Sequence, residues 1–211
     1  MLDENIRVDA VMLNSLGVVA MRIHPTQCGP GTYIHIVNHA IDGRELFYDP
    51  GDYKTYLTFL KERMSDEFSV IAYCLMPNHF HFLIRQNAYA PISALFEQPH
   101  KRYARYYNNK YDCRGRIFRG KLANKYVMED NYLVAACAYI HANPLQANLV
   151  SLPEDWEYSN FREFMGIRHG TLFSKQFVDD WIGNREDYRN KVVDTARKKS
   201  LQKAFAMDNI F

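Results

Sequence analysis

Two histidines one residue apart, His79 and His81, are the first residues of this sequence whose type and spacing could do chemistry. They follow Pro77-Asn78, a pair that indicates a tight turn leading into a strand. Strand side chains alternate between faces with a period of two, so both imidazoles should point one way and Phe80 the other. Two imidazoles on one face can bind a divalent metal, although most strand histidines are simply packed or exposed. The pair therefore needs further ligands nearby before it predicts a metal site.

A second candidate group lies further along the chain, in Tyr139-Ile140-His141-Ala142-Asn143-Pro144. Tyr139 and Asn143 are four residues apart, so they share one face of a predicted helix. Asn143 Oδ1 could join the two histidines as a third ligand, and this neutral donor set suits Mg²⁺ or Mn²⁺ completed by water and phosphate oxygens. Tyr139 would then be a hydroxyl nucleophile beside the metal. Alternatively, the tyrosine is an ordinary core or rim residue and Asn143 caps the helix.

Positive charge is concentrated between Pro99 and Lys125, although the net charge of the whole chain is only +2. That segment has nine basic residues and one acid, with tyrosines interleaved, which suits a phosphate-rich partner such as unpaired DNA. Arg116, Arg119 and Lys121 are the strongest candidates for phosphate contact, since their loop should flank the site. The full set of predicted DNA contacts is Arg102, Arg105, Arg114, Arg116, Arg119, Lys121 and Lys125.

The elements that must position these residues follow from hydrophobic periodicity and turn signals. Strands are predicted at residues 32–39, 68–75, 79–85 and 122–127. Helices are predicted at 53–64, capped by Asp49 or Asp52, at 91–108, and at 131–142, capped by Asp130 and ended by Pro144. The succession β-α-β-β-α-β-α predicts an α+β fold, a ferredoxin-like split βαβ antiparallel sheet with packed helices.

The chain is long enough, at 211 residues, for one buried domain with an appendage, and 47% hydrophobic residues are typical of a globular protein. We expect a leader of uncertain order at 1–30, a catalytic domain at 31–166 and a C-terminal helical extension at 167–211. The four cysteines have no metal-binding spacing, no stretch is long enough to span a membrane, and the first residues lack the charge of an export signal. These features favour a cytoplasmic, nucleoid-associated protein with reduced thiols.

Several of these segments together resemble the single-tyrosine HUH transposases, in the branch called REP-associated tyrosine transposases. The resemblance covers residues 32–166. It is carried by Tyr33-Ile34-His35-Ile36-Val37-Asn38, Ala72–His81, Tyr103-Ala104-Arg105-Tyr106 and Tyr139–Pro144 with Asn148-Leu149-Val150. It implies that Tyr139 attacks single-stranded or hairpin DNA and forms a 5′-phosphotyrosine, with His79, His81 and Asn143 as metal ligands. It also allows a homodimer.

The sequence departs from this family at three positions and leaves other functions open. His39 stands where relatives usually have arginine, and Gln146 and Asn148 stand where arginine and glycine are common. One alternative is a DNA- or RNA-binding regulator that keeps the fold without catalysis. Another is a zinc hydrolase, for which only His35 and His141 could supply a further strong ligand.

Overall fold

The computed structural model describes residues 29–127 and 132–198, and its centre is a four-stranded antiparallel sheet with the order β2-β3-β1-β4. The strands are β1 (Tyr33–His39), β2 (Phe68–Met76), β3 (His79–Gln86) and β4 (Ala123–Val127). Together with the β-α-β-β-α-β succession, this order is that of a ferredoxin-like split βαβ sheet. The predicted α+β fold class is confirmed.

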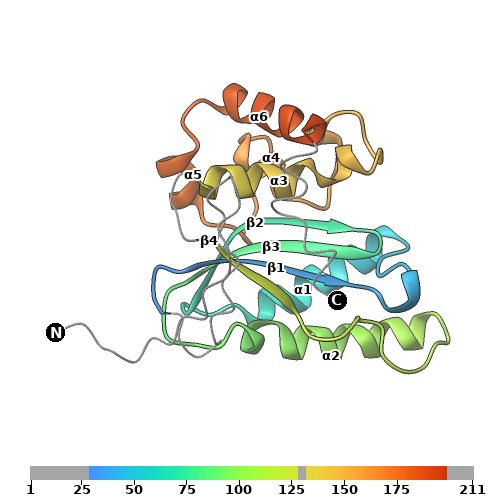
Figure 1. Ribbon diagram of the computed structural model, residues 1–211. Coiled ribbons are helices and arrows are strands. Elements are labelled where there is room, and N and C mark those ends of the chain that lie inside the picture. The colour runs from blue at the N-terminus through green and yellow to red at the C-terminus, as the bar shows by residue number, and fades with distance from the viewer. Residues whose placement is uncertain (1–28, 128–131, 199–211) are drawn as a thin grey trace, which may run out of the picture.

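Helices cover both faces of this sheet (Figure 1). Helices α1 and α2 pack together on one face, whereas α3 lies on the other face with α6 beyond it. Their bounds are α1 (Pro50–Arg63), α2 (Ser93–Lys110), α3 (Leu133–Gln146), α4 (Phe161–Phe164), α5 (Lys175–Trp181) and α6 (Arg185–Arg197). Short 3-10 helices η1 (Ile41–Gly43) and η3 (Pro153–Asp155) lie in the described connections.

The strand alternation divides the buried side chains between the two faces. Ile36, Phe80 and Phe82 are fully buried towards α1 and α2, and the Phe80 and Phe82 rings lie 6.0 and 5.6 Å from Phe96 of α2. Their strand neighbours therefore point to the other face, beneath α3. His81 is one of these neighbours.

Helix α1 begins at Pro50, earlier than predicted, because both candidate capping residues take part in its start. The Asp49 carboxylate accepts from the backbone N–H of Asp52, and the Asp52 carboxylate accepts from that of Asp49. This reciprocal pair satisfies two backbone donors that the helix leaves unpaired. Lys110 at the end of α2 contacts both carboxylates, at 2.6 and 2.7 Å, and so joins the two helices.

The prediction that Pro144 ends the third helix is wrong, because α3 continues to Gln146 with Pro144 inside it. A proline has no N–H to donate to the carbonyl four residues earlier, here that of Ile140. The side-chain amide of Asn143 replaces this donor: Nδ2 lies 3.3 Å from Ile140 O and 2.9 Å from Tyr139 O. The helix therefore continues through Pro144 with the Ile140 carbonyl still hydrogen-bonded. The predicted cap, Asp130, lies outside the described residues.

The outer edge of β2 is covered by the segment that follows η3. Leu75 N donates to Tyr158 O at 2.9 Å, and the Trp156 indole donates to Leu75 O at 3.0 Å. Phe161 and Phe164 of the same segment are fully buried on the α3 side. This segment therefore links the sheet to the C-terminal helices.

The described part of the C-terminal extension packs against α3. Val178 of α5 and Tyr188 and Val192 of α6 are buried in the same cluster as Ile140. Among residues 29–127 and 132–198, no helix has the length and apolar character that crossing a membrane requires. The three cysteines in these ranges, Cys74, Cys113 and Cys137, are free thiols.

Candidate functional site

Four histidines lie on the sheet face beneath α3. His35 and His39 belong to β1, and His79 and His81 belong to the adjacent strand β3, where His39 is paired directly with His79. The His39 and His79 rings stack with their centroids 4.9 Å apart, and His35 Nε2 lies 3.1 Å from His81 Nδ1. Each predicted ligand on β3 therefore has a second histidine beside it on β1.

Hydrogen bonds leave one nitrogen of each predicted ligand histidine available. His79 Nδ1 lies 2.7 Å from Asn78 Oδ1, an oxygen that only accepts, so Nδ1 carries the proton and Nε2 is left for another partner. His81 Nδ1 is engaged by His35, while His81 Nε2 is buried and has no hydrogen-bond partner within the described ranges. An unpaired buried nitrogen is costly unless something binds it.

Burial keeps these imidazoles neutral, which is the form that binds metals. It lowers the pKa of His79 to about 3, with a further contribution from His39. Burial and the nearby Lys125 lower the pKa of His35 to about 3. The pKa of His81 also lies well below its ordinary value because of burial and the neighbouring histidines.

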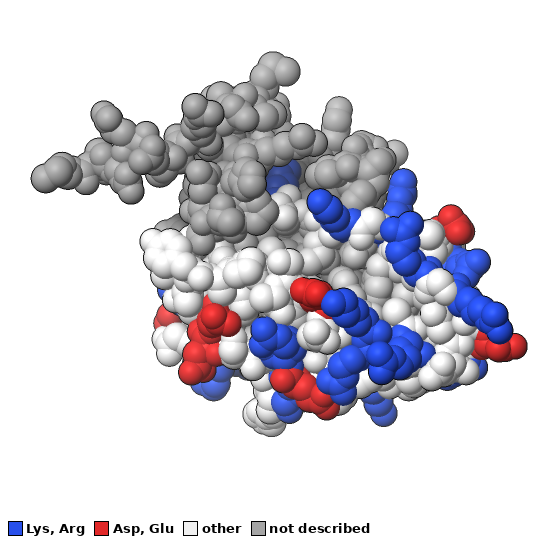
Figure 2. Space-filling model, turned by 90° about the horizontal axis from the view of Figure 1, so that it is seen from below, with Lys and Arg blue, Asp and Glu red and all other residues white. Residues whose placement is uncertain are grey.

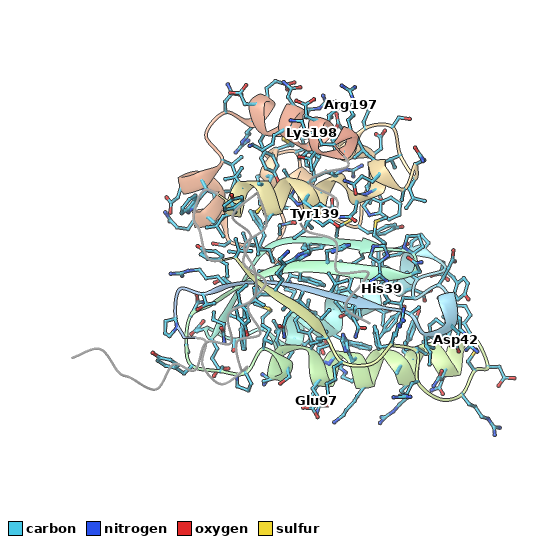
Figure 3. The ribbon with its side chains drawn as sticks, in the orientation of Figure 1. His39, Asp42, Glu97, Tyr139, Arg197 and Lys198 are labelled. Atoms are coloured by element: carbon cyan, nitrogen blue, oxygen red, sulfur yellow. The ribbon has the colours of Figure 1, made fainter. Side chains whose placement is uncertain are left out.

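Tyr139 projects from α3 towards these histidines (Figure 3). The centroid of its ring is 6.0 Å from that of His35 and 5.9 Å from that of His81, both edge-on. Only 4% of the residue is exposed. The helix and the sheet thus bring together a tyrosine and a histidine pair that are far apart in the sequence.

Asn143 lies on the same side of α3 as Tyr139, as the four-residue spacing predicted. Its Nδ2 atom donates to the Tyr139 and Ile140 carbonyls, so its Oδ1 atom is the part that can face other groups. Burial and the neighbouring histidines lower the pKa of His81, and the nearby Asn143 side chain partly opposes that shift, the direction that an acceptor oxygen produces. The Asn143 side chain therefore lies close to His81, as sharing a metal ion requires.

The donor set fits a divalent metal. His79, His81 and Asn143 would hold the ion through two imidazole nitrogens and an amide oxygen, and the buried His81 Nε2 is the atom that such an ion would satisfy. No three histidine, cysteine or carboxylate side chains within 29–127 and 132–198 are arranged to hold a metal by themselves.

Some of the predicted DNA contacts lie beside this site. Arg119 N donates to His39 O at 2.8 Å, so the loop before β4 runs along the end of the histidine row. Arg116, Arg119 and Lys121 are exposed in this loop. Lys125 on β4 is paired with His35 of β1, and its charge acts on the His35 imidazole. Arg119 and Lys125 therefore lie next to the candidate site, and Arg116 and Lys121 belong to the same loop as Arg119.

The structure does not bring Arg102 and Arg105 to the site. Both are exposed on α2, on the opposite side of the sheet from Tyr139. Arg102 pairs with Glu62 of α1 and lies 4.0 Å above the Phe59 ring, so it joins the two helices. Figure 2 looks onto this helical face and shows Lys and Arg gathered over part of it. Arg114 is exposed in the turn after α2.

Sequence reasoning missed two members of the histidine row. The sequence patterns indicate His35 only as a spare zinc ligand and His39 only as a departure from the family. The signal was present, because His35 and His39 are four apart in a strand and so share a face. His141 faces away from the row and uses both ring nitrogens elsewhere, with Tyr188 and Asn160. It is therefore unavailable for the alternative zinc site.

Comparison with known proteins places this fold and these motifs among the transposases, the enzymes of DNA transposition. The family model described as "Transposase IS200 like" matches residues 30–143, more than half of the chain. The chain therefore belongs to the IS200-like transposase family.

Two similar proteins bear the name of one branch of this family. A Haemophilus influenzae protein assigned as a REP-associated tyrosine transposase is 26% identical over 128 residues, which cover 56% of this chain and 68% of the relative. The solved structure of a REP-associated tyrosine transposase bound to a REP hairpin matches with a TM-score of 0.57 and 15% identity. That match covers 70% of this chain and 93% of the other, and it shows a shared fold.

Proposed function

We propose that this transposase cleaves and rejoins single-stranded or hairpin DNA, with Tyr139 as the nucleophile and a divalent metal at His79, His81 and Asn143. The observation that carries the proposal is the position of the Tyr139 ring above His81, whose Nε2 is buried without a partner among the described residues. The REP hairpin bound to the solved relative supports the choice of DNA.

In the proposed reaction the Tyr139 oxygen attacks a phosphodiester phosphorus. The Tyr139 O–P bond forms, the bond from phosphorus to the 3′ oxygen breaks, and the DNA downstream stays attached as a 5′-phosphotyrosine. The phenol loses its proton to solvent, and the departing oxygen takes one up to become a 3′-hydroxyl. Attack by a 3′-hydroxyl on the phosphotyrosine reverses these bond changes and joins two ends.

The chain's own residues would orient the substrate for this attack. Bound Mg²⁺ or Mn²⁺ would polarise the phosphoryl group and stabilise charge on its oxygens. Arg119 and Lys125, which lie beside the histidine row, would hold neighbouring phosphates together with Arg116 and Lys121 of the same loop.

The test is covalent capture. Labelled hairpin DNA is incubated with the protein and Mn²⁺ or Mg²⁺, beside Tyr139→Phe, and a denaturing gel is examined for a protein–DNA band. We expect a band that is lost in Tyr139→Phe and in samples treated with a chelator. A band that persists in Tyr139→Phe would reject Tyr139. Tight hairpin binding without any band would favour the alternative, a non-catalytic DNA- or RNA-binding regulator.

A further inference from the structure

Helix α3 carries a second buried polar group on the side away from the histidine row. His141 follows Tyr139 by two residues, which places the two side chains about 200° apart around the helix. Tyr139 faces the sheet, whereas His141 is 1% exposed and faces α6 and the segment after η3. Helix α3 thus directs Tyr139 towards the sheet and His141 towards α6.

The His141 imidazole is held by a chain of hydrogen bonds whose donors and acceptors can be assigned. Asn160 Oδ1 accepts from Tyr73 N at 2.7 Å, and Asn160 Nδ2 donates to Ile71 O at 2.9 Å, which settles the orientation of this amide. His141 Nε2, 2.9 Å from the same oxygen, must therefore be the protonated nitrogen. His141 Nδ1 then accepts from the Tyr188 hydroxyl at 2.7 Å.

Every polar atom of His141 and of the Asn160 side chain is satisfied by this chain. The His141 ring is also enclosed by aromatic edges, with ring centroids 5.6 Å away at Phe161 and 4.8 Å away at Phe164. Rotation or sliding of α3 would break at least one bond and leave a buried polar group unpaired, which is costly.

We propose that Tyr188, His141 and Asn160 are positioning residues that fix the rotation and height of α3, and thereby hold Tyr139 over His81. Asn160 ties α3 to β2, the neighbour of the strand that carries His81, and Tyr188 ties it to α6. Through Tyr188, the C-terminal extension then helps to position the candidate nucleophile. This inference rests on the proposed function for its kinetic consequence only, because the placement of Tyr139 can be measured without DNA.

The central variant is Tyr188→Phe, which removes one hydroxyl and leaves His141 Nδ1 unpaired. Its matched control is Val192→Ala, also on α6 and fully buried, which loosens the same packing without touching the hydrogen bonds. In a single-turnover assay we expect Tyr188→Phe to slow covalent capture by up to roughly 100-fold, because small misplacement of a reacting group has effects of that size. Hairpin affinity should change by less than about twofold, since the DNA contacts lie elsewhere. Val192→Ala should lower Tm as much as Tyr188→Phe does, yet keep nearly the full rate of covalent capture.

Two further measurements separate positioning from mere stability. His141→Gln can make both hydrogen bonds and should retain the capture rate, whereas His141→Leu should not. NMR signals of the His35 and His81 rings, which lie against Tyr139, should shift in Tyr188→Phe and stay in place in Val192→Ala. Equal slowing by Tyr188→Phe and Val192→Ala, or unshifted histidine signals in Tyr188→Phe, would overturn the inference. If the natural chain forms no covalent adduct, the proposed function fails, yet the NMR comparison still decides this point.

Discussion

His35 Nε2 and His81 Nδ1 share a hydrogen bond of 3.1 Å between the two central strands of the sheet. For His81 to bind a metal through Nε2, its Nδ1 must carry the proton and donate it to His35. Burial, with a contribution from Lys125, lowers the pKa of His35 and so keeps it neutral and able to accept this proton. His35 thus selects the tautomer of His81 that can act as a ligand.

Replacing His35 should therefore weaken metal binding. We expect His35→Leu to lower Mn²⁺ affinity by roughly 10- to 100-fold, the usual effect of losing a partner behind a metal ligand. His35→Gln, whose amide oxygen can accept the same proton, should recover part of the loss. Titration of Mn²⁺ followed by electron paramagnetic resonance measures both, and an unchanged affinity in His35→Leu would remove His35 from this role.

The Asn143–Pro144 pair should show energetic coupling. Asn143→Ala leaves the Ile140 carbonyl unpaired and should reduce the free energy of unfolding by about 1–3 kcal/mol. In a Pro144→Ala background the backbone N–H of residue 144 can serve that carbonyl, so the same substitution should cost less. A double-mutant cycle by urea denaturation should give a coupling energy of about 1 kcal/mol or more. Additive effects would show that Asn143 does not replace the missing donor.

Acid should destabilise the fold partly through His100. Its Nε2 atom lies 3.0 Å from the Tyr56 hydroxyl, and it packs against the uncharged rings of Phe80, Phe96 and Phe118. Burial lowers the pKa of His100 to about 3, whereas the unfolded chain binds this proton near pH 6.5. The folded state therefore binds fewer protons between these values, and stability falls as the pH drops from 6.5 towards 3.

The contribution of this one group is at most about 1.4 kcal/mol per pH unit across that range. His100→Phe keeps a ring against Phe118 and removes the titration, so its stability should decline less steeply on acidification than that of the natural chain. Urea midpoints at pH 7, 6, 5 and 4 would measure the difference. Parallel curves for the two proteins would contradict the assignment.

The two faces of the sheet should differ in their effect on DNA binding. Arg119→Gln, beside the histidine row, should weaken hairpin binding and reduce the slope of log affinity against log salt by roughly 0.9. Arg102→Gln removes the same charge from the α1–α2 face and should leave both quantities nearly unchanged, with a stability cost of at most about 1 kcal/mol. Fluorescence anisotropy at several salt concentrations tests the pair. Equal effects would place DNA on both faces.

Local patterns were enough to predict much of this protein. The period-two alternation at His79-Phe80-His81 gave the correct face for both histidines, and the four-residue spacing put Tyr139 and Asn143 on one side of a helix. The order of strands and helices led to the ferredoxin-like sheet. These properties depend on neighbours along the chain, so the sequence alone determines them.

Other properties depend on which segments meet across the fold. The register of β1 against β3 sets His39 beside His79 and brings His35 to His81, and no local pattern specifies that register. The basic segment was treated as one surface, yet the sheet separates Arg102 from Arg119 because α2 packs on the face away from α3. Pro144 stays inside α3 because the Asn143 amide supplies a donor that helix rules do not count. The tertiary structure decides these features because each depends on which particular groups come into contact once the chain has folded.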